Sequence, residues 1–157
     1  RMMGLVAWER GRAEGGEPVS DLVVRPSRLR GVEVEARDVP AAIDEVPVLV
    51  ALAARAEGET RITGAGELRV KESDRIAALV HALHAVGGEA EELEDGLVVR
   101  GSDRPLRGRV VTHGDHRIAM AFGVLAALPG NEIEIDDRAC AAVSYPGFWD
   151  VLASLRA

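Results

Sequence analysis

The alternation of apolar and polar positions predicts a series of short strands early in the chain. Two strand-like runs, residues 5–8 and 22–25, flank a polar loop with paired glycines, which favours a hairpin. Residues 31–35 alternate apolar and acidic side chains, as a half-buried strand does. The run 46–56 is apolar on nearly every side, so it predicts a helix that is buried over most of its surface.

A helix with one apolar face is predicted over residues 76–86. Apolar side chains recur there at three- and four-residue intervals, and a glycine pair follows as a stop signal. The sequence then predicts a strand pair around an Asp-Gly turn, an apolar helix, another strand and a final helix. These elements are residues 89–93, 97–100, 118–128, 130–135 and 146–155.

Part of the sequence is repeated. Residues 22–31 contain Leu-Val-Val-Arg followed by Leu-Arg-Gly, and residues 97–108 contain the same two motifs in the same order. The repeating unit is β-α-β-α-β-β, with one complete copy from about 32 to 100 and an incomplete copy from about 110 to 157. Such repeats pack their helices together. We therefore expect a mixed α/β fold of the α+β type, with buried parallel helices side by side and outer four-stranded sheets.

Composition limits the kinds of partner. The 157 residues suit one domain, and a net charge of −7 with no basic tract and few aromatic residues argues against nucleic-acid binding. No apolar run approaches the length of about 18 residues that indicates a membrane span. The single cysteine, Cys140, excludes an internal disulfide, fits a reducing cytoplasm and is expected to be a buried small residue.

Because the chain opens with Arg1, as though finishing a helix begun upstream, we expect a piece of a longer protein.

Charged turns precede the three predicted helices that begin near residues 46, 76 and 118. Acidic residues suit a helix start, because free N–H groups and the positive end of the helix dipole favour anions. Lys71, Arg75 and Arg117 oppose that dipole, and we expect Lys71 and its charged neighbours in the first turn of their helix. Such cations make most sense if an anion binds among them. The alternative is a set of ordinary surface ion pairs of small value.

The second charged turn, LRVKESDRI, resembles a signature of the EPSP synthase (3-phosphoshikimate 1-carboxyvinyltransferase) family. The motifs Ile-Asp-Glu-Val-Pro upstream, and Gly-Asp-His-Arg and Val-Ser-Tyr-Pro downstream, follow the family's order. The resemblance implies the C-terminal part of a two-domain transferase of the shikimate pathway, which serves aromatic amino acid biosynthesis. Residues 1–157 would be one partial domain, because the family builds a domain from three such units whose helix N-termini converge on the interdomain cleft.

The resemblance also implies roles for the acidic residues and for one histidine. Asp44 matches an aspartate that contacts the shikimate hydroxyl and is a candidate general base. Glu72 matches an acid/base candidate for the methyl or methylene carbon of the enolpyruvyl group, and Asp115 and His116 match residues that line the site, with His116 a further catalytic candidate. On spacing alone, Asp44 is equally consistent with an ordinary helix-start acid.

By the same resemblance, the three cations would bind the substrates. Lys71 would contact shikimate 3-phosphate, and Arg75 and Arg117 would hold phosphoenolpyruvate. The chain departs from the family at one position, because many members carry a phosphoenolpyruvate-binding lysine where Val143 stands here. That departure leaves open which cation completes the anion site.

Two other functions remain as alternatives. One is an enzyme like the UDP-N-acetylglucosamine enolpyruvyl transferase, which the 71–75 sequence favours less, and the other is a non-catalytic binding module on the same scaffold. His113 and His116 lack the ligand spacing of a metal motif, so we expect no metal. The implied transferase needs no cofactor. Its partners would be shikimate 3-phosphate, phosphoenolpyruvate and the missing N-terminal domain.

Overall fold

A computed structural model describes residue 2 and residues 4–155 of the chain. Its elements form three sheets: a β1–β2 hairpin, a four-stranded sheet of order β3-β4-β6-β5, and a β7–β8 pair. The strands are β1 Leu5–Glu14, β2 Glu17–Arg25, β3 Glu33–Val34, β4 Glu59–Ile62, β5 Glu89–Leu93, β6 Gly96–Arg100, β7 Arg107–Val110 and β8 Glu132–Ile135. The helices are α1 Val46–Ala53, α2 Arg75–Ala85, α3 His116–Ala126 and α4 Phe148–Ser154, with short 3-10 turns at Val39–Ala41, Gly66–Val70 and Ala139–Val143.

The predicted repeat is confirmed in the order and pairing of these elements. From β3 to β6 the chain runs β-α-β-α-β-β, and its strands form one four-stranded sheet in which β3 and β4 are parallel. β7, α3 and β8 begin a second unit, and β7 pairs with β8 in parallel as β3 pairs with β4. The mixed α/β fold class with outer sheets and inner helices therefore follows the sequence prediction.

The core lies between the helices and the sheets, and α1 packs against α3 as predicted. Burial of α1 is less complete than its apolar sequence predicts, because Val48 is 37% exposed and Leu52 is 40% exposed. These two side chains lie one helical turn apart and line an open cavity of about 860 Å³ together with Val124 and Leu128 of α3 and the segment after it. The helix also ends at Ala53, three residues before its predicted end, where the backbone tightens through an Ala56 N–H to Ala53 carbonyl bond of 3.1 Å.

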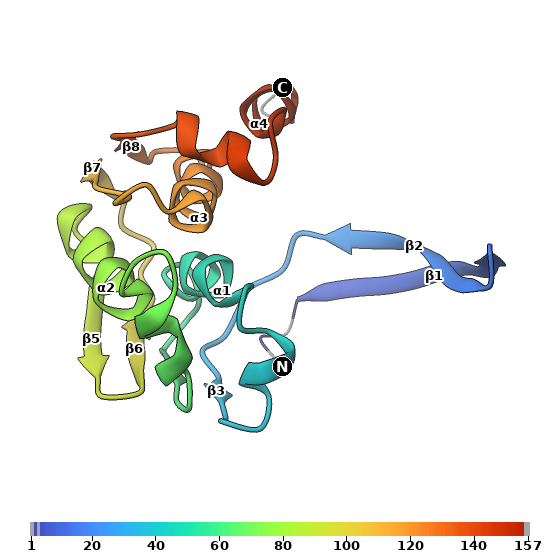
Figure 1. Cartoon of the computed structure of the whole chain (residues 1–157), viewed down its shortest axis with the longest axis horizontal. Coiled ribbons are helices and arrows are strands. Elements are labelled where there is room, and N and C mark those ends of the chain that lie inside the picture. Colours follow the sequence, from blue (N-terminus) through green and yellow to red (C-terminus); the bar gives the residue numbers. More distant parts are fainter. Residues whose placement is uncertain (1, 3, 156–157) are drawn as a thin grey trace.

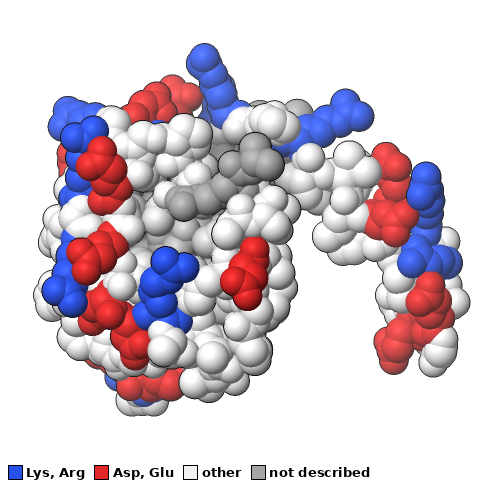
Figure 2. All heavy atoms as spheres, turned by 90° about the horizontal axis from the view of Figure 1, so that it is seen from above, with Lys and Arg blue, Asp and Glu red and all other residues white. Residues whose placement is uncertain are grey.

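The predicted hairpin is confirmed and is longer than predicted. β1 and β2 pair in antiparallel register from Leu5 with Arg25 to Glu14 with Glu17, with an irregularity between Glu9 and Arg12. The hairpin projects away from the rest of the molecule (Figure 1). Figure 2 shows both signs of charge toward the tip of this arm and uncharged atoms nearer the body.

Candidate active site

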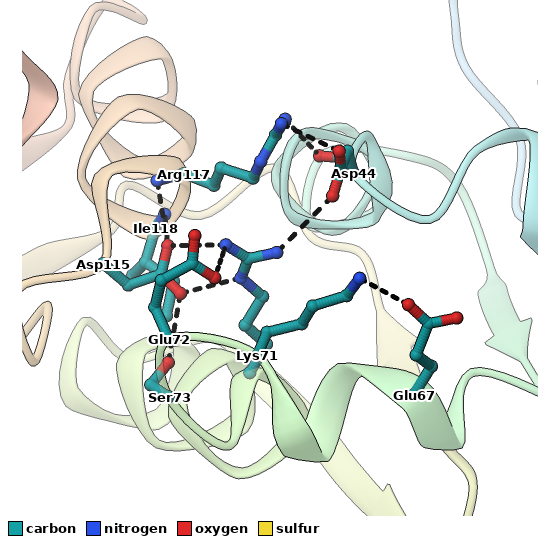
Figure 3. Close-up of polar contacts among 9 residues, drawn as sticks. Asp44, Glu67, Lys71, Glu72, Ser73, Asp115, Arg117 and Ile118 are labelled. Carbon is teal, nitrogen blue, oxygen red and sulfur yellow. Dashed lines mark hydrogen bonds and ion pairs between the residues drawn. The ribbon is translucent and has the colours of Figure 1, made fainter. Parts of the chain in front are cut away.

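The structure brings the three charged turns together at one place. Asp44 precedes α1, Glu72 precedes α2, and Asp115 and Arg117 stand at the start of α3. Their side chains point toward one another (Figure 3). The clustering follows from the fold, because the packed helices present their N-terminal ends on the same side. An anion placed there would meet free backbone N–H groups and the positive ends of helix dipoles.

Arg75 occupies the centre of the cluster and is almost fully buried, with 1% of the residue exposed. Its Nε donates to Asp115 Oδ2 at 2.7 Å, and its Nη2 donates to Glu72 Oε2 at 2.6 Å. Its Nη1 lies 3.6 Å from Asp44 Oδ1, beyond hydrogen-bond distance. One guanidinium thus ties together carboxylates from all three turns. The planar fork of an arginine suits this task better than the point charge of a lysine does.

Asp115 is fully buried at 0% exposure and has two tasks. It caps α3, because its Oδ1 accepts from the Arg117 N–H at 2.9 Å, and it also pairs with Arg75 and accepts from the Ser73 hydroxyl at 3.1 Å. Burial raises the pKa of Asp115, but the hydrogen bond and charge of Arg75 and the Arg117 N–H outweigh it, so the net pKa is lowered. The carboxylate is therefore held ionised in the interior and fixes the position of Arg75.

Arg117 and Asp44 form the more accessible part of the cluster. Arg117 Nη2 donates to Asp44 Oδ2 at 2.9 Å, and its Nη1 donates to the Asp44 backbone carbonyl at 3.0 Å. Their side chains are 31% and 44% exposed, so solvent or a ligand reaches both. Asp44 does not cap α1, since Glu45 holds the cap position. The pair therefore links the starts of α1 and α3.

The second turn differs from its prediction. We expected Lys71 and Glu72 in the first turn of α2, but the helix begins at Arg75 and this expectation is wrong. The helix does not start earlier, because Asp74 is its N-cap residue. The Asp74 side chain accepts a hydrogen bond from the Ala77 N–H at 3.1 Å. Lys71 and Glu72 lie before the cap, and the Lys71 ammonium pairs with Glu67.

His116 is less closely involved than the other predicted residues. It is the first residue of α3 and is 8% exposed. Within the part of the chain that the structure describes, its imidazole makes no hydrogen bond or ion pair with the charged cluster. Cys140 is buried, as predicted, and burial together with the charge of Asp137 raises the pKa of its thiol. Val143, at the position of the family's lysine, is 79% exposed.

Two residues that hold the site together were not singled out from the sequence. Ser73 bonds Asp115 from forty-two positions away. Arg69 donates to the backbone carbonyls of Glu94 and Leu93 at 2.8 and 2.6 Å and to the Asp74 carboxylate at 2.8 Å. It fixes the segment before α2 onto the β5–β6 turn. The sequence signal for Arg69 is its position in the LRVKESDRI motif. The resemblance implies roles for the other two cations of that motif, Lys71 and Arg75, but none for Arg69.

The lowered pKa of Asp115 predicts a pH dependence of stability. A group whose pKa is lower in the folded state adds stability above its unfolded pKa of about 3.9, and loses it as the pH falls toward the folded pKa. We therefore expect wild type to exceed Asp115→Asn in unfolding free energy at pH 7, with the difference shrinking steadily below about pH 4. Urea titrations of both proteins between pH 7 and pH 3 measure this. A difference that stays constant over that range would contradict the assignment.

Residues 2 and 4–155 lack both a membrane-spanning helix and a cluster of metal ligands. None of the helices formed there is both long and apolar enough to cross a membrane. The same residues contain no group of three or more histidine, cysteine, aspartate or glutamate side chains placed to hold a metal ion.

Known proteins resemble this chain over nearly its whole length. A family model for EPSP synthase (3-phosphoshikimate 1-carboxyvinyltransferase) matches residues 3–152. The chain belongs to the EPSP synthase family. It is 48% identical over 146 residues to the 3-phosphoshikimate 1-carboxyvinyltransferase of Salinibacter ruber, covering 92% of this chain and 34% of that relative. The same enzyme of Parvibaculum lavamentivorans is 50% identical over 148 residues, which cover 93% of this chain and 33% of the relative.

A solved structure gives the same result for the fold. The EPSP synthase of Acinetobacter baumannii superimposes with a TM-score of 0.86 at 38% identity, covering 99% of this chain and 36% of that one. The chain thus spans about a third of the length of the curated relatives that it matches.

Proposed function

We propose that this chain supplies one half of the active site of an enzyme that transfers the enolpyruvyl group of phosphoenolpyruvate to the 5-hydroxyl of shikimate 3-phosphate. The products are EPSP and inorganic phosphate. The observation that carries the proposal is the meeting of Asp44, Glu72 and Arg117 around the buried Arg75 guanidinium. Carboxylates and cations from three separate helix starts are the groups that this transfer needs in one place.

The reaction requires proton transfers at two points. The hydroxyl oxygen of the shikimate substrate adds to C2 of phosphoenolpyruvate while it loses a proton to a base, and C3 gains a proton to become a methyl group. Phosphate then leaves C2, and a proton is removed from the same methyl group to restore the double bond. Asp44 is the proposed base at the hydroxyl, and Glu72 is the proposed acid and then base at C3. Both side chains are about half exposed, at 44% and 51%, so a substrate reaches them.

The cations bind and neutralise the anionic groups. Arg117, which is 31% exposed, is the first guanidinium that phosphoenolpyruvate contacts. Lys71 gives up its ion pair with Glu67 and binds the phosphate of the shikimate substrate instead. Arg75 lies beneath Asp44 and Glu72 and offers Nη1, which is 3.6 Å from the nearest carboxylate oxygen of Asp44. Fixed cations of this kind stabilise the charge of the departing phosphate. Asp115 holds Arg75 in place, and His116 borders the site at the start of α3.

The proposal makes this chain a partial domain of a two-domain protein. The N-terminal domain would provide the other wall of the site, and closure of the two domains on the substrates would exclude water. Support for this arrangement comes from the share of about a third that the chain covers in its relatives. The cytoplasm is the proposed location, and no cofactor takes part in the proposed reaction.

Arg117 provides the test of this assignment. In a full-length protein that contains this chain, we expect Arg117→Ala to raise the dissociation constant for phosphoenolpyruvate by about tenfold or more, since a charged hydrogen bond contributes about 1.5–3 kcal/mol. Isothermal titration calorimetry measures the constant. The matched control is Arg109→Ala, which removes an arginine paired with Glu134 at 3.5 Å on the exposed β7–β8 surface. Equal affinities in wild type and Arg117→Ala, or equal losses in both variants, would contradict the proposal.

A further inference from the structure

Glu72 lies on irregular chain between a 3-10 turn and α2. Residues 71–74 follow the turn Gly66–Val70 and form neither helix nor strand. The Glu72 side chain is 51% exposed, so burial does not hold this stretch in place. Arg75 binds the Glu72 carboxylate at 2.6 Å (Figure 3), but a group that transfers protons also needs a backbone held to within about 0.5 Å. The backbone that carries Glu72 therefore needs a support of its own.

Arg69 provides that support from the preceding turn. Its Nε donates to the Glu94 carbonyl at 2.8 Å, and its Nη2 donates to the Leu93 carbonyl at 2.6 Å. Its Nη1 donates to Asp74 Oδ2 at 2.8 Å and lies 2.9 Å from Glu92 Oε1. The planar fork of an arginine makes all these contacts at once, whereas a lysine has a single ammonium.

The β5–β6 turn also holds the beginning of the same segment. Asp95 Oδ2 accepts from the Gly64 N–H at 2.9 Å, and the Asp95 carbonyl accepts from the Ala65 N–H at 2.6 Å. Residues 64–74 are thus attached to this turn near both of their ends. Glu72 lies between Arg69 and Asp74, so the bond between those two side chains closes a short ring of chain that contains it.

We propose that Arg69 is a positioning residue for Glu72. It ties residues 69–74 to the β5–β6 turn and so holds the Glu72 carboxylate where it reaches the reacting carbon. This role rests on the proposed function, in which Glu72 transfers protons at C3 of phosphoenolpyruvate. The Arg69 guanidinium is engaged by the turn and by Asp74, so Arg69 acts through Glu72 and not on a substrate.

The test measures kcat and the KM for phosphoenolpyruvate in a full-length protein that contains this chain. We expect Arg69→Gln to lower kcat by about tenfold to a hundredfold, because a displacement of about 1 Å in a site lowers the rate by as much as about a hundredfold. The KM for phosphoenolpyruvate should stay within about threefold of wild type, because Arg117 on α3 binds that substrate. Arg69→Lys should give an intermediate kcat, since it keeps the charge beside Asp74 but loses the fork.

Arg100→Gln is the matched control. Arg100 lies on β6 of the same hairpin and pairs with Glu59 at 3.3 Å and with Glu91 at 3.7 Å, away from residues 64–74. It is the same substitution on the same sheet, and it also breaks two ion pairs. We expect Arg100→Gln to keep the kcat of wild type.

A second background separates positioning from a general loss of structure. In a protein that already carries Glu72→Gln, Arg69→Gln should lower kcat by less than about threefold, because the residue that it positions no longer transfers protons. A substitution that only damages the fold lowers kcat by the same factor in both backgrounds. Arg69→Lys provides the same comparison if Arg69→Gln does not fold.

The outcomes distinguish this inference from the proposed function. A large loss of kcat in Glu72→Gln together with wild-type kcat in Arg69→Gln would overturn the role of Arg69 alone. Equal losses from Arg69→Gln in the two backgrounds would do the same. Wild-type kcat in Glu72→Gln would overturn the proposed role of Glu72, and the role of Arg69 with it.

Discussion

We expect Glu72→Gln and Asp44→Asn, each introduced into a full-length protein that contains this chain, to lower kcat by about 10²–10⁴-fold, the usual contribution of a proton-transfer group. Both substitutions keep the shape and an acceptor oxygen, so Asp44→Asn still accepts from Arg117 and Glu72→Gln still meets Arg75. The KM values should change much less, because proton transfer rather than binding is lost. Steady-state assays of phosphate release measure both quantities.

Glu45→Gln is the matched control for this prediction. Glu45 is the sequence neighbour of Asp44, is exposed, and makes no side-chain cap to α1. We expect its kcat to match that of wild type. If Asp44→Asn or Glu72→Gln retained kcat within a few-fold of the Glu45→Gln control, the proton-transfer role of that residue would be wrong.

The second large effect concerns stability. We expect Asp115→Ala to lower the free energy of unfolding by about 3–5 kcal/mol, because it leaves the Arg75 charge buried without its main partner. The loss of the α3 cap adds about 1 kcal/mol. Urea denaturation at pH 7 measures the change.

An exposed ion pair and a double variant test the cause of that loss. Glu134→Ala breaks the ion pair between Arg109 and Glu134, whose side chains are 63% and 70% exposed. It should lower the free energy of unfolding by less than about 1 kcal/mol. Arg75→Met combined with Asp115→Leu removes both buried charges and should recover much of the stability that Asp115→Ala loses. Asp115→Ala and Glu134→Ala with equal effects would contradict the buried-pair interpretation.

The fold followed from the sequence because its signals are local. Apolar spacing predicts α2, the paired glycines predict the hairpin turn, and the repeated Leu-Val-Val-Arg motif predicts the structural repeat. Helix boundaries were less well predicted. Asp74 caps α2 through one hydrogen bond to Ala77, and a run of charged residues does not reveal which acid makes that bond.

The site residues could be chosen from the sequence, but their connections could not. Arg75 binds Asp115 from forty positions away and Arg117 binds Asp44 from seventy-three positions away, so both pairs depend on how the helices pack. An arginine is rarely fully buried, and its sequence context gave no sign that Arg75 would be. Its burial distinguishes Arg75 from Arg117, although the resemblance implies the same role, binding of phosphoenolpyruvate, for both. Burial likewise makes Asp115 a residue that positions Arg75 rather than an exposed wall of the site.

Complementation tests the central claim, that this chain is half of an enolpyruvyl transferase site, most directly. Phosphate release is measured with phosphoenolpyruvate and shikimate 3-phosphate, first with the chain alone and then with the remaining part of the full-length protein added as a separate polypeptide. We expect no turnover by the chain alone and turnover on mixing, and we expect Glu72→Gln in the chain to abolish that turnover. Turnover by the chain alone at the rate of the intact protein, or no turnover by the intact protein itself, would contradict it.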